Sequence, residues 1–292
     1  MKIAAIGEAM IELSMVGDTP QIGVAGDTLN TAIYLKRSAP NVQVDYVTRL
    51  GGDAFSQRIA QFIGAEGLGI DAIEKDAEKT CGLYGITTDQ AGERTFTYWR
   101  NESAARAVFS GPNGPSFDWL SGYDVIYLSG ISLAILPEDT RAALLRWLTN
   151  YRTQGRRVVY DSNYRPALWS DRQTAQQVTR QMWHMCDIAL PSQDDEAAIF
   201  DETLEDVAAR FVAMSKTGAL KRGPEGPLCL ETGQSHSYAA ATQVVDTTAA
   251  GDSFNGGYLG ALLEGAAQVD ALRAGHELAA KVVCHRGAII PA

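Results

Sequence analysis

Short apolar runs alternate along this chain with longer stretches whose apolar residues recur at helical spacing. The apolar runs cover residues 2–6, 42–47, 125–128, 158–160 and 188–190. The helical stretches cover residues 28–36, 56–63, 138–151, 172–185, 204–214 and 268–284. Repeated strand–helix units of this kind fold into a mostly parallel sheet with helices on both faces. The sequence therefore predicts an α/β protein with a ligand site beyond the carboxyl ends of its strands.

One segment breaks the alternation. Residues 81–88 and 93–100 are two strand-like runs with no helix between them, joined by residues 89–92, which predicts a β-hairpin. Alternation along a strand places Tyr84 and Ile86 on one face of the first run, and Phe96, Tyr98 and Arg100 on one face of the second. Such a hairpin is either a decoration at the sheet edge or a lid over a site, and the residues alone leave both open.

Size and charge limit the possible classes of protein. The chain has 292 residues, of which 46% are hydrophobic, and it contains no linker, so we expect a single domain spanning residues 1–292. Its net charge of −10 argues against a nucleic-acid partner. No apolar run approaches the roughly 20 residues that span a membrane, and the apolar N-terminal run is too short for a signal peptide, so we expect a cytoplasmic protein without a membrane partner. The cysteines and histidines show no zinc-ligand spacing.

The segment 246–257 carries the clearest chemical signal. It is expected to form a turn between a short strand at 244–245 and a helix. Ala249, Ala250 and Gly251 have almost no side chain, so an anion can approach the backbone N–H groups of that helix. Asp252 lies at the positive end of the helix, where we expect it to stay ionised and to accept a proton from a bound hydroxyl. A plain turn capped by an aspartate is the simpler alternative.

The whole segment resembles, position by position, the second signature of the ribokinase-like (phosphofructokinase-B) sugar kinases. The resemblance implies that Ala249, Ala250 and Gly251 form the anion hole for the transferring phosphoryl group of ATP, and that Asp252 is the catalytic base. It also implies a Rossmann-type sandwich with a small β-sheet lid, inserted at about residues 10–25 and 81–100. In many family members this lid supplies a dimer contact, so a homo-oligomer is expected.

Residues 25–32 place a glycine and an aspartate at a helix start, which by itself predicts a helix with Asp27 as its N-cap. The segment also resembles the first signature of the family, and residues 50–53 complete that pattern. The resemblance implies that Gly26, Asp27 and Asn30 contact the sugar.

Polar turns after other strands are candidates for the nucleotide side. Asn163 and Arg165 follow the strand at 158–160, and the Arg165 guanidinium suits a carboxylate or a phosphate. Lys221, Gly223 and Gly226 lie in a probable hairpin loop that borders the nucleotide in the family.

The magnesium ligands are not readable from the sequence. Relatives often carry Asn-x-x-Glu at the position where this chain has Ser192 and Asp195, or Glu196 if the pattern is shifted by one residue. Ser192 is therefore carried as a nucleotide contact, and Asp195 and Glu196 as candidate Mg²⁺ ligands. The segment 275–287 is the candidate region for a monovalent cation. The chain has no P-loop motif.

Further segments look like those of bacterial 2-keto-3-deoxygluconate kinases, namely residues 7–13, 92–101, 127–134, 163–169 and 286–291. A sugar acid would need cationic and hydroxyl donors for its carboxylate, and Arg100, Arg165, Tyr84 and Tyr98 are the candidates. We therefore expect ATP-dependent phosphorylation of the terminal hydroxyl of 2-keto-3-deoxygluconate, with ATP and Mg²⁺. The alternatives are a fructokinase or another neutral-sugar kinase, and a non-catalytic regulator that binds sugar acids.

Overall fold

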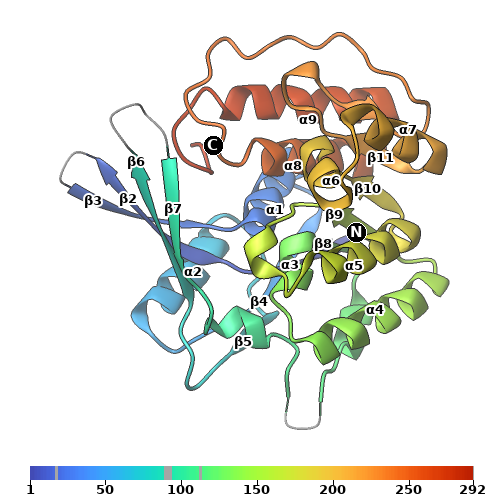
Figure 1. The fold of residues 1–292 in the computed structure, drawn as a ribbon. Helices are drawn as coiled ribbons and strands as arrows, with labels where there is room; N and C mark the ends of the chain where they lie inside the picture. The colour runs from blue at the N-terminus through green and yellow to red at the C-terminus, as the bar shows by residue number, and fades with distance from the viewer. Residues whose placement is uncertain (17–18, 89–93, 112–113, 292) are drawn as a thin grey trace.

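The computed structural model describes residues 1–16, 19–88, 94–111 and 114–291, and these residues form two β-sheets (Figure 1). The larger sheet has eight strands in the order β12-β11-β10-β9-β8-β1-β4-β5. Neighbouring strands run parallel except β11 and β12, which are antiparallel. The strands are β1 (Lys2–Ile6), β4 (Gln43–Leu50), β5 (Ile73–Lys75), β8 (Val125–Ser129), β9 (Arg157–Asp161), β10 (Ile188–Leu190), β11 (Thr217–Leu220) and β12 (Leu228–Cys229). The predicted mostly parallel sheet is confirmed.

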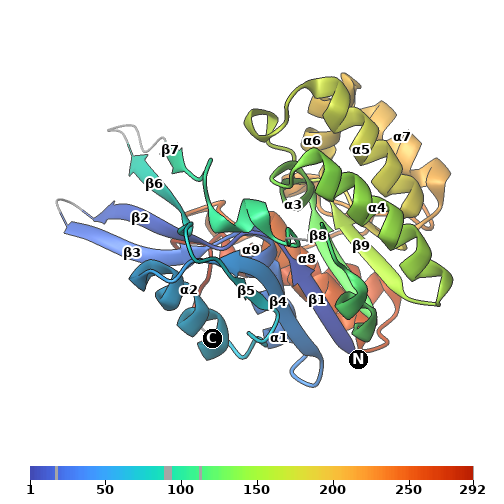
Figure 2. The ribbon, with the colours of Figure 1, turned by 90° about the horizontal axis from the view of Figure 1, so that it is seen from below.

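Helices cover both faces of this sheet (Figure 2). One face packs against α1 (Asp27–Ser38), α2 (Ala54–Ala65), α8 (Ala250–Leu263) and α9 (Gln268–Val282). The other packs against α3 (Gly130–Ala134), α4 (Glu138–Thr153), α5 (Arg172–Met185), α6 (Gln193–Phe200) and α7 (Leu204–Met214). Short 3₁₀ turns lie at Ala104–Ala107, Asp118–Gly122, Pro166–Leu168 and Gly223–Glu225. Within the described ranges, no helix is long and apolar enough to cross a membrane.

The two helical layers explain why the strands are continuous apolar runs. In β1, Ala4 and Ile6 belong to one hydrophobic cluster, whereas Ile3 and Ala5 belong to the other. Each central strand must therefore bury both of its faces, which requires apolar residues at every position rather than at alternate ones.

The expected strand at 244–245 is wrong. Val244 and Val245 lie in a long connection that passes over α9 (Figure 1), and Val244 is 68% exposed. The N–H groups of Val245 and Asp246 both donate to the carbonyl oxygen of Val283, at 2.8 and 3.1 Å. Two apolar residues do not make a strand when no neighbouring sheet edge is there to pair with them.

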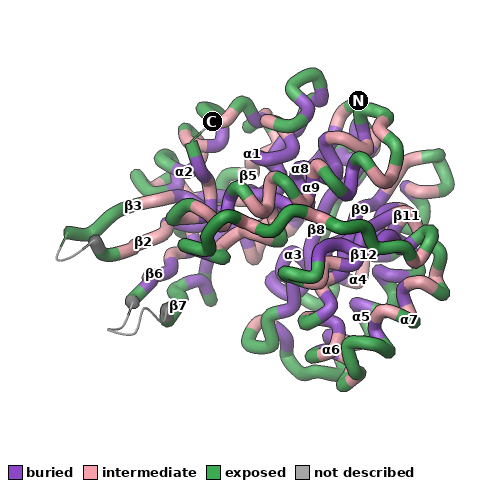
Figure 3. Tube along the Cα trace, turned by 90° about the horizontal axis from the view of Figure 1, so that it is seen from above, coloured by how far each residue is buried: buried purple, intermediate pink, exposed green. Residues whose placement is uncertain are grey.

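The second sheet projects from one side of the body, as Figure 1 shows. Its strand order is β3-β2-β6-β7, formed by β2 (Met10–Val16), β3 (Thr19–Ala25), β6 (Gly82–Thr88) and β7 (Arg94–Trp99). The predicted pairing of two strands around 81–100 is confirmed, and their connection at 89–92 falls outside the described residues. Figure 3 shows that this sheet is buried near the body and more exposed towards its tips. We call it the lid sheet.

Helices α1 and α8 approach each other closely, and this contact places the site. A Cβ added to Gly256 of α8 would lie 2.4 Å from Cβ of Tyr34 on α1, so only glycine fits there. At the start of α1, a Cβ on Gly26 would lie 2.2 Å from the backbone oxygen of Glu8. The Gly256 contact draws α1 and α8 together, and the hydrogen bonds from Asn30 and Thr31 to Asp252 join the two helices at the start of α8.

Candidate active site

The predicted sugar contacts and the predicted base meet between the N-termini of α1 and α8. Asn30 Nδ2 donates to Asp252 Oδ2 at 2.8 Å, across 222 residues of sequence. The other amide atom, Asn30 Oδ1, accepts from the N–H of Gly26 at 3.4 Å. The two signature segments identified in the sequence therefore form one site, in which Asn30 holds the carboxylate of Asp252.

The start of α8 has the geometry expected of an anion cradle. The helix begins at Ala250, and Ala249 precedes it in the left-handed region with φ of 60°. No side chain caps this helix. The N–H of Ala250 already donates to the carbonyl oxygen of Thr247 at 3.2 Å, so the backbone donors that an anion would meet in the predicted cradle are those of Ala249 and Gly251.

The ionisation of Asp252 differs from the expectation. Removal of the carboxyl from water raises the pKa of Asp252 to about 8, and Asp27 and Asp161 add to that rise. The Asn30 hydrogen bond and Lys221 act in the opposite direction without reversing it. Without a ligand, the neutral form of Asp252 is thus favoured at pH 7, because burial outweighs the helix dipole on which the expectation rested.

Asp27 is not the N-cap of α1, because Gly26 occupies that position and no side chain caps the helix. The carboxylate accepts instead from Ser129 Oγ at 2.5 Å and from Asn163 Nδ2 at 2.9 Å. Burial raises the pKa of Asp27. Asn163, a predicted nucleotide contact, thus lies directly beside a predicted sugar contact.

Lys221 lies beside the start of α8. Its Nζ donates to Asp161 Oδ1 at 2.7 Å and to Asn255 Oδ1 at 3.2 Å. A Cβ on Gly251 would lie 3.8 Å from the same Nζ. In the β11–β12 hairpin loop, Gly223 is exposed and Gly226 is buried beneath the ring of Tyr238.

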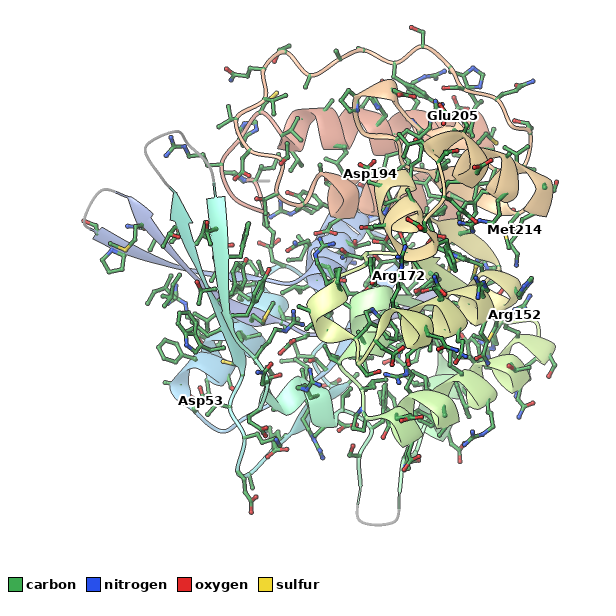
Figure 4. The ribbon with its side chains drawn as sticks, in the orientation of Figure 1. Asp53, Arg152, Arg172, Asp194, Glu205 and Met214 are labelled. Carbon is green, nitrogen blue, oxygen red and sulfur yellow. The ribbon has the colours of Figure 1, made fainter. Side chains whose placement is uncertain are left out.

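The three acids at the start of α6 point in different directions. Asp194, labelled in Figure 4, is exposed. Asp195 accepts from Ser162 Oγ at 3.3 Å, and its carboxylate lies 3.8 Å from Nη1 of Arg165. Ser192 caps the helix by accepting from the N–H of Asp195. Arg165 itself is half exposed.

Glu196 is wrong as a metal candidate. It is buried in the core, where it accepts from Trp183 Nε1 and Arg210 Nη2, both at 3.0 Å. Burial raises its pKa to about 7. One residue along a helix rotates the side chain by about 100°, so Glu196 and Asp195 cannot both face the site. No cluster of three or more metal-binding side chains occurs among the described residues.

Two of the predicted substrate groups on the lid sheet are already paired. Arg100 is buried against Glu8, with Nε donating to Oε2 at 2.8 Å. The hydroxyl of Tyr84 donates to Glu12, so in this arrangement it can only accept from a ligand. Tyr98 is 49% exposed and lies next to Tyr84, with 5.8 Å between ring centroids.

The sequence pattern predicted no role for Glu8, Glu12, Asp161 or Asn255. A signal existed for two of them, since Asp161 ends β9 immediately before Ser162 and Asn255 lies inside the 246–257 segment. Glu8 and Glu12 become visible only through their partners in space.

Comparison with known proteins identifies the family. The model of the pfkB family carbohydrate kinases matches residues 1–292. The 2-dehydro-3-deoxygluconokinase of Escherichia coli strain K12 is 43% identical over 300 residues, covering 99% of this chain and 97% of that protein. The enzyme of the same name from Dickeya dadantii is 43% identical over 299 residues, covering 99% and 96%.

Solved structures agree with this result. A PfkB protein from Polaromonas superposes with a TM-score of 0.82 at 25% identity, covering 97% of this chain and 95% of that one. The aminoimidazole riboside kinase of Salmonella enterica, complexed with its riboside and an ATP analog, has a TM-score of 0.81 at 21% identity, covering 98% and 94%. At 21% identity, the likeness to the riboside kinase shows a shared fold only. With a family match over its full length, the chain belongs to the pfkB family of carbohydrate kinases.

Proposed function

We propose that this protein is a 2-dehydro-3-deoxygluconokinase, the enzyme also called 2-keto-3-deoxygluconate kinase. It transfers the γ-phosphoryl group of ATP to the terminal hydroxyl of the sugar acid. Four relatives with this name are 40–43% identical over 99% of the chain. The observation that carries the proposal is the Asn30–Asp252 hydrogen bond, which joins a predicted sugar contact to the predicted base at the uncapped start of α8.

The mechanism uses Asp252 as the general base. The terminal hydroxyl oxygen attacks the γ-phosphorus, its proton passes to Asp252 Oδ, and the bond between phosphorus and the β,γ-bridging oxygen breaks to release ADP. The N–H groups of Ala249 and Gly251 stabilise the charge on the transferring group, and Ala250 keeps the turn between them free of a bulky side chain. Asn30 keeps the carboxylate in position for this step.

Sugar recognition in this proposal combines the body and the lid sheet. Gly26, Asp27 and Asn30 contact the hydroxyl groups of the sugar. Tyr98 and Arg165 are exposed enough to reach the carboxylate. Arg100 contributes only through the part of its guanidinium that faces away from Glu8, and Tyr84 only as an acceptor.

ATP is proposed to bind near Asn163, Arg165, Ser192, Lys221, Gly223 and Gly226, with its phosphates at the start of α8. Magnesium bound with nucleotide phosphates needs only one or two protein carboxylates, so Asp195 fits as its ligand. The metal would supply neutralisation of phosphate charge. A monovalent cation near residues 275–287, closure of the lid sheet, a dimer through that sheet and a cytoplasmic location stay predictions.

Substrate panels separate the alternatives. We expect purified protein to release ADP with 2-keto-3-deoxygluconate at far higher kcat/KM than with fructose or ribose, measured in a coupled assay that also includes the galactonate epimer. A preference for fructose would favour the fructokinase alternative, which relatives at 24–26% identity keep open. Binding of the sugar acid without ADP release would favour a regulator.

The base is tested by Asp252→Asn. The substitution keeps the shape of the side chain but removes the proton acceptor, so we expect kcat to fall about 10²- to 10⁴-fold while the protein stays folded by circular dichroism. Asp270→Asn, which changes an exposed acid in the first turn of α9, is the matched control and should retain wild-type kcat. A wild-type rate for Asp252→Asn would contradict the assignment.

A further inference from the structure

A chain of hydrogen-bonded polar side chains from β8, β9 and α1 leads to Asp252 at the start of α8. Asn255 Nδ2 donates to Asp161 Oδ2 at 2.8 Å and to the hydroxyl of Tyr127 at 3.3 Å. The Tyr127 hydroxyl lies 3.1 Å from Thr31 Oγ1, which donates to the backbone oxygen of Asp252 at 3.2 Å. Asp161 and Lys221 complete the chain at its other end.

Asp161 links Lys221 to Asn255 at the end of this chain that is farther from Asp252 along the hydrogen bonds. It is 2% exposed, and its two carboxylate oxygens accept from different partners, Lys221 and Asn255. Because Lys221 Nζ also donates to Asn255 Oδ1, the three side chains close a ring of hydrogen bonds. Such a ring removes the freedom of a long lysine side chain and keeps its ammonium at one place.

The Lys221 ammonium is held beside the anion cradle at the start of α8. Two N–H groups of the ammonium are used by Asp161 and Asn255, and the described residues supply no acceptor for the third. Apart from the neighbouring residues and the backbone of α8 itself, Lys221 Nζ is the only described heavy atom within 4 Å of a Cβ built on Gly251, at 3.8 Å. A charged donor with one unused N–H thus stands beside the first turn of α8.

We propose that Asp161 and Asn255 are positioning residues that hold the Lys221 ammonium against the first turn of α8, where it binds the transferring phosphoryl group. This inference rests on the proposed kinase activity. Lys221 then contacts the transferred phosphoryl group itself rather than the border of the nucleotide. Asp161 and Asn255, for which the sequence predicted no role, then position that lysine.

The arrangement has a physical advantage. Asn255 lies on α8 three residues after Asp252, so one helix places both the base and the support of the cation. A cation held before the reaction begins stabilises developing charge without the cost of reorganisation. Its Asp161 partner compensates the charge while the site is empty, since an unpaired buried ion is costly.

Kinetics of Lys221→Met, Asp161→Asn and the double variant test the proposal. We expect kcat to fall about 100-fold in Lys221→Met and about 10-fold in Asp161→Asn, with the sugar-acid KM changed less than threefold. The double variant should be no slower than Lys221→Met, because Asp161 acts through the lysine. Lys221→Arg should recover part of the loss. Lys216→Met, at the opposite end of β11, is the matched control and should keep wild-type kcat.

Nucleotide binding gives a readout that needs no sugar. By calorimetry with Mg²⁺, Lys221→Met should bind a non-hydrolysable ATP analogue at least tenfold more weakly than the wild type and bind ADP equally well. Equal weakening of both nucleotides would overturn the proposal, as would additive losses in the double variant. Recovery of Asp161→Asn at high Mg²⁺ would overturn it too, by making Asp161 a metal contact. If the wild-type protein bound the analogue but phosphorylated no sugar acid, the proposed substrate would be contradicted. The nucleotide-binding comparison would still test whether Lys221 binds the γ-phosphoryl group.

Discussion

Asp252 shows how one residue acquires its chemistry from neighbours that are distant in sequence. Its position after Gly251 at a helix start was enough to predict a base. Its proton affinity is set instead by burial and by Asp27 and Asp161, which arrive from other elements. The sequence pattern therefore pointed to Asp252 as a candidate base, but the expectation that it stays ionised was wrong because desolvation is a property of the packed molecule.

This environment predicts the pH dependence of the reaction. A base must be unprotonated to act, and the pKa of Asp252 is raised to about 8 in the free protein. We therefore expect kcat/KM for the sugar acid to be constant above that pH and to fall about tenfold per unit below it. Steady-state rates between pH 5.5 and 9.5 measure the profile.

Asp27→Asn provides the internal comparison for this profile. Removing the Asp27 charge should move the acidic limb to lower pH, since that charge raises the pKa of Asp252, even though the overall rate also drops. A wild-type profile that stayed flat down to pH 5.5 would contradict the assigned environment.

Among the elements, α8 has the most demanding packing. The sequence signature ends in two small residues, Gly256 and Gly257, and the structure gives their reason. Gly256 faces Tyr34 of α1, and Gly257 lies 2.9 Å, measured from an added Cβ, from the backbone oxygen of Ala274 on α9. The signature thus describes a helix that must approach two others, in addition to a phosphate loop.

Gly256→Ala tests this packing. The new methyl group would overlap Tyr34, so we expect a loss of about 1–3 kcal/mol in the free energy of unfolding, measured by urea titration. Separation of α1 from α8 should also weaken the Asn30–Asp252 contact and lower kcat. Gly122→Ala, where an added Cβ meets nothing within 4 Å, should change neither quantity. Equal stability of the two variants would show that α1 and α8 tolerate a wider spacing.

In the lid sheet, strand periodicity predicted which residues share a face but not which residues they meet on other strands. Alternation correctly grouped Tyr84 with Ile86, which share a small buried cluster. It did not reveal that Glu12 lies opposite Tyr84 on β2, or that Glu8 follows β1 beside Arg100. Pairing between strands depends on register, which the residues of a single strand do not encode.

At the scale of the whole molecule, the site joins segments that are far apart in the chain. Ser129 and Asn163 both donate to the carboxyl group of Asp27, although Asp27 and Asn163 are 136 residues apart. The lid sheet shares its buried cluster with Ala288 near the C-terminus, so it has little core of its own. These contacts favour a single domain over residues 1–292, which stays a prediction.

Unfolding experiments test this prediction. We expect one cooperative transition in urea, with the same midpoint by far-ultraviolet circular dichroism and by tryptophan fluorescence. Trp99 lies exposed on the lid sheet, whereas Trp183 is buried in the body. Comparing the wild type with Trp99→Phe isolates the fluorescence of the lid sheet. A separate early transition of Trp99 would indicate that the lid sheet unfolds on its own.

The sequence by itself determined the parallel α/β layer, most helix positions and the lid strands, and it pointed to Asp252 as the candidate base and to the turn before it as the candidate cradle. These features follow from local periodicity and from short segments whose geometry is set by neighbouring residues. Only the tertiary structure decided that Asn30 holds Asp252, that Glu196 points into the core, and that Asp161 and Asn255 hold Lys221. Hydrogen bonds between distant segments, and the burial that shifts a pKa, depend on how the layers pack, and no local pattern of residues records that packing.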